Sequence, residues 1–288
     1  MSRGEFRRLI ESEQIVLMPV VHDALSAVMA EKAGFKAIAT AGYANSASMI
    51  GRPDIGLLTL TEMAECARRI VDSVSLPVFA DGDTGHGGIN NIMRTVRLFE
   101  RAGVEALMLE DQVSPKRCGH MSGKEVVGAE EMSIRLKAAL RARTQEGMLI
   151  VARTDSLYEH GLEEAIERSN TYLDIGADMV FVEAPRSRQE LEEIPRRVKG
   201  PVMANMIPGG TTPLCSAQEL QKMGYALVAY PTVCTHAIAQ AAQRVFAHLK
   251  LTGEVESISG QMMGFQELHA ILGLDDIRAE EDDLRHRL

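Results

Sequence analysis

Short apolar runs rich in β-branched residues alternate along the chain with longer segments whose apolar residues recur every three or four positions. The first pattern is typical of buried strands and the second of helices packed against them. Strands that alternate with helices favour a parallel sheet covered by those helices. The predicted strands are residues 15–21, 36–41, 76–81, 106–110, 148–153, 179–183, 202–205 and 226–230. The predicted helices between them are 23–32, 60–74, 90–102, 129–143, 161–174, 189–198 and 217–223.

Four glycines support this division. Each stands between a predicted helix and the next predicted strand, and glycine most readily adopts the left-handed conformation that ends a helix. Eight such units in 288 residues predict one α/β domain, a (β/α)8 TIM barrel. The alternative is an open doubly wound sheet, but residues 20–23 lack the glycine-rich dinucleotide fingerprint expected after its first strand. The four glycines are Gly34, Gly103, Gly176 and Gly224.

An amphipathic stretch at 260–272 follows the eighth predicted helix, which spans about 234–251. We predict a C-terminal helical extension over about 255–288, within a single barrel domain of residues 1–288. The extra helix either packs on its own barrel or is exchanged between subunits, and the sequence favours neither. Because a complete barrel has no obvious need for this apolar face, we expect a homo-oligomer, most simply a tetramer. The charged tail at 275–288 is expected to be a solvated end.

The composition excludes several classes of function. The 31 Lys and Arg residues and 40 Asp and Glu residues give a formal charge of −9, so the basic surface of a nucleic-acid-binding protein is not expected. No uninterrupted apolar stretch reaches about 18 residues and the N-terminal segment is charged, so we expect a cytoplasmic protein without a membrane partner. The four cysteines show neither disulfide nor zinc spacing. A small molecule is therefore the expected partner.

Polar residues stand at or just after the ends of the predicted strands, where TIM barrel enzymes carry their active sites. One such residue is often only a helix cap, but a set that converges on one mouth indicates a functional site. In chain order these residues are Asp81, Asp83, Glu110, Arg153, Glu183, Asn205 and Thr232.

Three of these residues point to a metal ion. Asp81, Asp83 and Glu110 would crowd carboxylates into a small volume, where their mutual repulsion calls for a cation. Oxygen ligands without nearby Cys or His pairs favour Mg²⁺, or Mn²⁺, over zinc. The alternative is that the acids pair only with Arg153 and Lys116.

The connection after the fourth predicted strand carries the sequence PKRCGH at 115–120. Its Cys118 is flanked by Lys116, an arginine and His120, and a thiol among cations gives or takes a proton readily near neutral pH. We interpret this polar connection as a gating loop, with Cys118, Lys116 and His120 as candidate catalytic residues. The other three cysteines are expected to be inert.

These motifs resemble the isocitrate lyase and phosphoenolpyruvate mutase superfamily over nearly the whole chain. The resemblance implies a Mg²⁺-dependent barrel that acts on 2-oxo acids or their aldol-type adducts, usually as a tetramer with exchanged C-terminal helices. It also implies that Asp81, Asp83 and Glu110 form the metal shell, mostly through water. The resembling stretches are GY at 42–43, GRPD at 51–54, DGDTG at 81–85, EDQ at 110–112, PKRCGH at 115–120, ARTD at 152–155, EA at 183–184 and ANM at 204–206.

The resemblance further implies which groups contact the substrate. Gly42 and Tyr43 would offer backbone donors to a 2-oxo acid, while Arg153 and Glu183 would bind or polarise the reacting molecule. Two positions depart from the methylisocitrate lyase pattern: Ala39 replaces a tyrosine and His86 replaces an aromatic residue. The complete predicted substrate-binding set is Gly42, Tyr43, Asp54, Gly119, Asn205 and Thr232.

The PKRCGH loop is typical of the carbon–carbon lyases of this family. We therefore expect a lyase that cleaves a 2-hydroxy di- or tricarboxylate, of the 2-methylisocitrate or 2,3-dimethylmalate type, to a 2-oxo acid such as pyruvate and a carboxylate. The alternatives on the same barrel are a carboxyphosphonoenolpyruvate phosphonomutase, whose branch has a closely similar loop, and an oxaloacetate hydrolase or decarboxylase. A barrel that binds ligands without catalysis is a more distant third.

Overall fold

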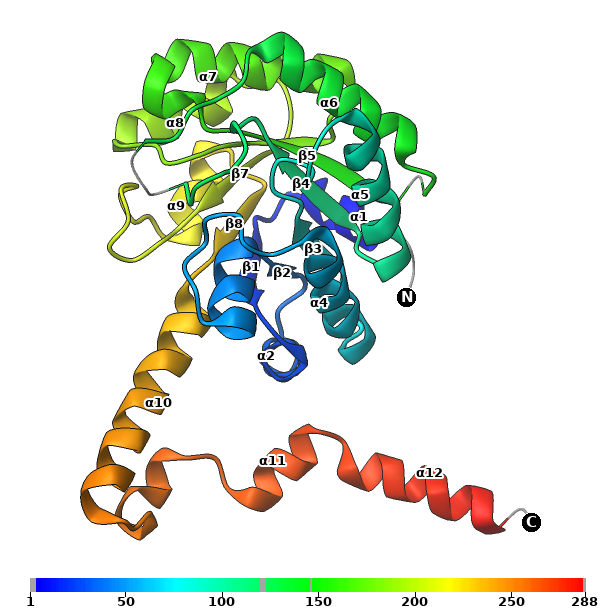
Figure 1. Ribbon diagram of the computed structural model, residues 1–288, viewed down its shortest axis with the longest axis vertical. Coiled ribbons are helices and arrows are strands. Elements are labelled where there is room, and N and C mark those ends of the chain that lie inside the picture. The colour runs from blue at the N-terminus through cyan, green and yellow to red at the C-terminus, as the bar shows by residue number, and fades with distance from the viewer. Residues whose placement is uncertain (1–3, 120–122, 146, 287–288) are drawn as a thin grey trace. The chain divides into compact units, whose positions relative to one another are not determined.

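The computed structural model describes residues 4–119, 123–145 and 147–286 (Figure 1). The chain divides into two compact units, Met1–Thr235 and His236–Leu288, and each is described by itself. The division falls inside the long helix α10 (Val233–Thr252), ahead of residue 255, the predicted start of the C-terminal extension.

The first unit is built around eight parallel strands that close into a barrel, with the eighth strand paired to the first. This closure confirms the predicted TIM barrel and excludes the open sheet. The strands are β1 (Val16–Val21), β2 (Ile38–Thr40), β3 (Val78–Asp81), β4 (Ala106–Glu110), β5 (Leu149–Thr154), β6 (Met179–Val182), β7 (Val202–Asn205) and β8 (Leu227–Tyr230). The helices up to α10 are α1 (Glu5–Ile10), α2 (Ala24–Lys32), α3 (Gly42–Asn45), the π-helix η1 (Ser46–Ile50), α4 (Leu60–Ser73), α5 (Ile89–Ala102), α6 (Ala129–Ala142), α7 (Ser156–Ile175), α8 (Arg188–Arg197) and α9 (Ala217–Met223).

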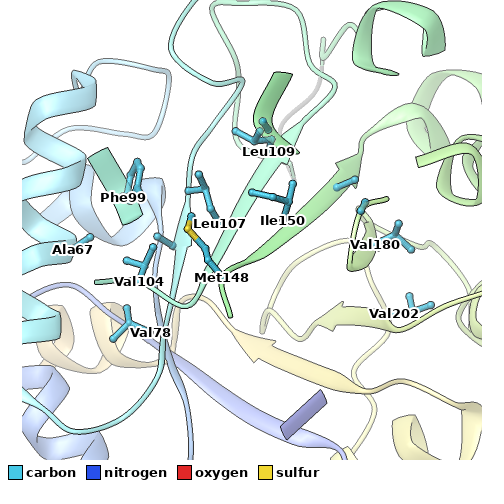
Figure 2. Close-up of a cluster of buried hydrophobic side chains, with 14 of the residues drawn as sticks. Ala67, Val78, Phe99, Val104, Leu107, Leu109, Met148, Ile150, Val180 and Val202 are labelled. Atoms are coloured by element: carbon cyan, nitrogen blue, oxygen red, sulfur yellow. The ribbon is translucent and has the colours of Figure 1, made fainter. Parts of the chain in front are cut away.

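Successive side chains of each strand point to opposite sides of the barrel wall, which creates two apolar cores. One core lies between the strands and the helices, and Figure 2 shows part of it, with Leu107 and Leu109 of β4 near Ile150 of β5. The other core fills the barrel interior and includes Met108, the residue between the two leucines. The same alternation continues to the strand ends, where it decides which polar side chains enter the mouth.

The N-terminal helix α1 is an element that the sequence pattern did not predict. Its Phe6 is fully buried in the interior core, with ring centroids 6.0 Å apart between Phe6 and Phe79 of β3. The backbone N–H of Phe6 donates to Glu105 Oε2 at 2.8 Å. The helix is too short for a periodic signal, and its place depends on contacts with distant strands.

The glycines that separate predicted helices from predicted strands all have positive φ, which confirms their role as helix ends. A fifth glycine, Gly161, marks a difference from the predicted helix start. Helix α7 begins at Ser156, but Gly161 has φ of 84° and interrupts the helical geometry, so one turn precedes the predicted segment.

The second unit contains the remainder of α10, the 3-10 helix η2 (Glu256–Gln261), α11 (Phe265–Ile271) and α12 (Leu274–His286). The prediction of one continuous amphipathic stretch at 260–272 was wrong, because Met262 and Gly264 are extended and separate η2 from α11. Residues 275–286 of the charged tail are exposed, as predicted, but they are helical. Asp275 and Asp276 lie in the first turn of α12 and Arg285 and His286 in the last, and charges at these positions favour a helix through the helix dipole.

None of the helices in the described ranges is both long enough and apolar enough to cross a membrane.

Candidate active site

The alternation of side chains along the strands brings five of the predicted site residues to one mouth. The interior core includes one residue near the carboxyl end of each of five strands, and the residue two positions later points the same way. The interior residues are Phe79, Met108, Val151, Phe181 and Met203, and the residues two positions later are Asp81, Glu110, Arg153, Glu183 and Asn205. These five residues therefore share a face because they share a strand parity, whereas Asp83 and Thr232 follow the ends of β3 and β8.

Lys116 forms the first of two cationic centres at this mouth. Its Nζ lies 2.7 Å from Asp54 Oδ2 and 2.9 Å from Asp83 Oδ1, and all three side chains are buried. Burial alone would lower the pKa of Lys116, but the charges of Asp83, Asp81, Glu110 and Asp54 raise the pKa well above its ordinary value. Lys116 is therefore protonated among these carboxyl groups.

Backbone donors hold Asp81 beside this centre. Its carboxylate accepts hydrogen bonds from the N–H of Asp83 at 3.0 Å and from the N–H of Gly42 at 3.3 Å. A Cβ on Gly42 would lie 2.9 Å from Lys116 Nζ, so a larger residue at this position would displace the ammonium. Burial, opposed by Lys116, raises the pKa of Asp83 to about 6. The predicted Gly42 donor is thus directed at Asp81 in this structure.

Arg153 is the second cationic centre. Its Nε lies 2.8 Å from Asp155 Oδ2 and 3.4 Å from Glu110 Oε2, and its Nη2 lies 3.3 Å from Glu183 Oε2. Burial raises the pKa of Glu110 well above its ordinary value, although Arg153 and Lys116 oppose the shift. Glu110 therefore lies within the electrostatic influence of both cations.

The loop after β4 reaches this second centre through Gly119. A Cβ on Gly119 would lie 2.5 Å from Arg153 Nη2 and 2.5 Å from Glu183 Cδ, so its backbone is in direct contact with both side chains. The adjacent Cys118 is half-buried. Burial is the larger cause of the raised pKa of Tyr43, and the charge of a Cys118 thiolate is the smaller one. The structure thus brings Cys118, Gly119 and Tyr43 to the mouth, while the predicted residue His120 lies outside the described residues.

Two predicted residues, Asn205 and Thr232, form no hydrogen bond with Lys116 or Arg153 within the described ranges. Asn205 Oδ1 and Thr232 Oγ1 are buried and, within the part of the chain that the structure describes, have no hydrogen-bond partner. Glu110 Oε1 and His86 Nε2 share this property. Buried polar atoms of this kind cost free energy unless they are satisfied, so these four atoms are available to a ligand or to water.

The charges at this mouth are unbalanced, and the imbalance fits a divalent cation. Six buried carboxyl groups lie with three buried cations; they are Asp54, Asp81, Asp83, Glu110, Asp155 and Glu183, with Lys116, Lys124 and Arg153. In the described ranges no three His, Cys, Asp or Glu side chains converge closely enough to ligate one ion directly. Acids that hold Mg²⁺ through its waters can lie further apart. The donor set therefore fits a hydrated hard cation. The alternative, in which the acids pair only with Arg153 and Lys116, accounts for only some of the buried carboxyl groups.

The buried side chains that support the site from behind were not predicted from the sequence pattern. Asp111 follows Glu110, so its side chain points away from the mouth, and it is fully buried. Its carboxylate accepts hydrogen bonds from Thr154 Oγ1 at 2.7 Å, Asp155 N–H at 2.9 Å, Arg168 Nη1 at 3.2 Å and Tyr172 OH at 3.2 Å. The sequence does carry one signal for this support. Asp111 faces away from the mouth, and Arg168 and Tyr172 lie four positions apart on one face of a predicted helix, where both can contact the same acid.

A closed barrel whose strand ends assemble buried acids, an arginine and a lysine around one mouth defines a TIM barrel enzyme. The family model described as phosphoenolpyruvate phosphomutase matches residues 6–250. The chain belongs to the phosphoenolpyruvate mutase and isocitrate lyase superfamily, as its motifs predicted.

Similar proteins within this superfamily catalyse several different reactions. The 2,3-dimethylmalate lyase of Eubacterium barkeri is 41% identical over 278 residues, which cover 96% of each chain. The chloroplastic carboxyvinyl-carboxyphosphonate phosphorylmutase of Arabidopsis thaliana is 44% identical over 98% of this chain and 86% of its own. A structure of oxaloacetate acetylhydrolase with 3,3-difluorooxalacetate superposes with a TM-score of 0.93 at 32% identity and covers 98% of this chain and 96% of its own. A phosphonopyruvate hydrolase solved with oxalate and Mg²⁺ has a TM-score of 0.88 at 27% identity, with 98% and 99% coverage.

Proposed function

We propose that this enzyme is a carbon–carbon lyase that cleaves a 2-hydroxy di- or tricarboxylate, of the 2-methylisocitrate or 2,3-dimethylmalate type, to a 2-oxo acid such as pyruvate and a carboxylate. The observation that carries the proposal is the contact of the Gly119 backbone with Arg153 and Glu183, because it brings the neighbouring Cys118 to the charged mouth. The similarity to 2,3-dimethylmalate lyase over 96% of both chains supports it.

We propose Mg²⁺, with Mn²⁺ as a substitute, as the cofactor, held by Asp81, Asp83 and Glu110 mostly through water. A bound Mg²⁺ would supply a Lewis acid that lowers the pKa of the substrate 2-hydroxyl. The Mg²⁺ and oxalate in phosphonopyruvate hydrolase support this assignment. The excess of buried carboxyl groups in this chain supports it independently.

In the proposed reaction a carboxylate of the mouth takes the proton of the 2-hydroxyl, and the electron pair of the O–H bond forms the carbonyl of the 2-oxo acid as the carbon–carbon bond breaks. The electrons of that bond pass to the leaving carboxylate fragment as an enediolate. Cys118 Sγ–H donates the proton that the fragment then needs, and Arg153 stabilises the charge that develops during cleavage. Glu183 polarises the substrate, and Lys116 and His120 complete the proposed catalytic set. The proposed binding groups are Gly42, Tyr43, Asp54, Gly119, Asn205 and Thr232.

A panel of 2-hydroxy acids with Mg²⁺, monitored for released 2-oxo acid by reduction with lactate dehydrogenase, tests the reaction. Release of a 2-oxo acid from a 2-hydroxy di- or tricarboxylate would support the lyase proposal. The second candidate is the phosphonomutase, which the 44% identical phosphorylmutase favours; carboxyphosphonoenolpyruvate, followed by ³¹P NMR, would then yield a new phosphorus–carbon bond. Oxalate formed from oxaloacetate would instead assign a hydrolase. Formation of a phosphorus–carbon bond or of oxalate, without cleavage of any 2-hydroxy acid, would contradict the lyase proposal.

We also propose a homo-oligomer, most simply a tetramer, in which the C-terminal extension is exchanged between subunits. In the second unit Phe246, Leu251 and Phe265 are 67%, 85% and 73% exposed, and such large apolar side chains are stabilised when a partner covers them. Deletion of residues 260–288 should lower the mass measured by light scattering on a sizing column. A monomeric mass both before and after the deletion would contradict the proposal.

A further inference from the structure

Lys124 is a buried lysine near the mouth that belongs to none of the predicted site residues. Its side chain is 1% exposed. The ammonium Nζ donates to the carbonyl oxygen of Gly119 at 2.5 Å and to Asp155 Oδ1 at 2.7 Å. A buried ammonium is tolerated only when it is paired and hydrogen-bonded, so these two contacts determine where Lys124 lies.

Asp155 connects Lys124 to Arg153. Its side chain is fully buried, and it accepts hydrogen bonds from Arg153 Nε at 2.8 Å and from Arg153 Nη2 at 3.1 Å. Its backbone N–H is held by Asp111 at 2.9 Å. Burial acts to raise the pKa of Asp155, but Arg153 and Lys124 hold the pKa at about 2. An ionised carboxylate with a fixed backbone therefore joins the two cations.

Gly119, in the loop after β4, contacts both Lys124 and Arg153. Its carbonyl oxygen accepts from Lys124, and its Cα lies against Arg153 and Glu183. Lys124 thus contacts the loop backbone directly and the guanidinium of Arg153 through one carboxylate. Cys118 is the residue next to this contact, so a displacement of Gly119 displaces the thiol.

We propose that Lys124 is a positioning residue that holds the Cys118–Gly119 backbone in register with the guanidinium of Arg153. The inference rests on the proposed function, because the kinetic test measures the proposed reaction. The contacts of Lys124 with Gly119 and Asp155 do not depend on the substrate. Without the ammonium, the Gly119 carbonyl loses its donor and Asp155 is left with Arg153 alone. The loop and Arg153 can then move independently, and a displacement of about 1 Å between reacting groups lowers a rate by about 10²-fold.

A purely structural role for Lys124 makes a different prediction. Lys124 Nζ also lies 5.4 Å from the ring centroid of Tyr158, so the residue contributes to packing on α7. If packing were its only role, replacement would lower the free energy of unfolding but leave the geometry of Cys118 unchanged. The test therefore needs a measurement that reports on Cys118 and not only on stability.

The test compares Lys124→Met, which keeps the apolar stem without the ammonium, with Lys124→Arg, which keeps a charged donor. Lys137→Met, at an exposed position on α6, is the matched control. The measurements are kcat and KM for 2-oxo acid release and, with no substrate present, the rate at which iodoacetamide modifies Cys118, read from the mass of its peptide. Thermal unfolding verifies that each variant is folded, and Lys124→Gln, which keeps a neutral donor, replaces Lys124→Met if that variant does not fold.

We expect Lys124→Met to lower kcat about 10²-fold, to change KM by less than about threefold and to change the Cys118 modification rate several-fold. Lys124→Arg should recover part of both effects, and Lys137→Met should match the parent enzyme. A folded Lys124→Met or Lys124→Gln with parental kcat and parental Cys118 reactivity would overturn the proposal. If the parent enzyme releases no 2-oxo acid, the proposed function fails, while Cys118 reactivity still decides the role of Lys124.

Discussion

Replacement of Gly119 by alanine adds one methyl group at a crowded point of the site. The new Cβ would lie 2.5 Å from Arg153 Nη2 and 2.5 Å from Glu183 Cδ, whereas ordinary van der Waals contacts begin at 3.4 Å. Arg153 cannot move away freely because Asp155 holds it at 2.8 Å. The loop must therefore shift by about 1 Å relative to the two charged side chains.

The size of the effect follows from this displacement. A shift of about 1 Å between reacting groups lowers a rate by about 10²-fold, which corresponds to about 2.7 kcal/mol of transition-state stabilisation. The overpacking itself lowers the free energy of unfolding by about 1 to 3 kcal/mol, so the variant is expected to fold. The loss should appear in kcat, since the methyl group changes geometry more than it removes a binding contact.

Steady-state kinetics of Gly119→Ala, with urea unfolding in parallel, measures both quantities. The matched control is Gly128→Ala, because Gly128 has φ of −58° and a Cβ there would meet no atom within 4 Å. Alanine adopts this backbone conformation without strain, so Gly128→Ala should fold and should keep the parental kcat. A Gly119→Ala enzyme with the same kcat as Gly128→Ala would refute the contact between Gly119 and Arg153 in the working enzyme.

Three further outcomes follow from the same geometry. Cys118→Ser, whose hydroxyl is a much weaker acid than a thiol, should lower kcat by about 10²- to 10⁴-fold while calorimetry finds Mg²⁺ and 2-oxo acid binding nearly unchanged; a parental kcat would assign the proton to another group. EDTA should abolish turnover and Mg²⁺ or Mn²⁺ should restore it, and Asp81→Ala should be inactive but cooperatively folded; full activity in chelator would exclude the metal. Asp155 has a folded-state pKa of about 2, below the unfolded value of about 3.9, so its stabilising contribution is complete above about pH 4 and is lost as the pH falls toward 2. Asp155→Asn should therefore flatten the dependence of the free energy of unfolding on pH over that interval in urea titrations, and an unchanged slope would contradict the assignment.

Much of the fold was predictable because its determinants are local. A strand buried on both faces requires a short apolar run, and a helix that covers it requires apolar residues every three or four positions. Glu110 and Arg153 end such runs, and β4 and β5 carry each of them two positions after an interior residue, so their placement in the mouth follows from the alternation of the strand. Helix α1 and the break before α11 were not predictable in this way, since short helices gain their stability from packing rather than from their own sequence.

The pairing of charges at the mouth was decided by the tertiary structure alone. Lys116 meets Asp54 across 62 residues of sequence, and Lys124 meets Asp155 across 31. No periodicity encodes such partners, because closure of the barrel creates the buried space in which a charge must find an opposite charge and hydrogen bonds. The apolar runs of the sequence specify which residue types reach the ends of the strands. The closed barrel decided which acid each cation neutralises, because removal of these groups from water makes an unpaired charge too costly to remain.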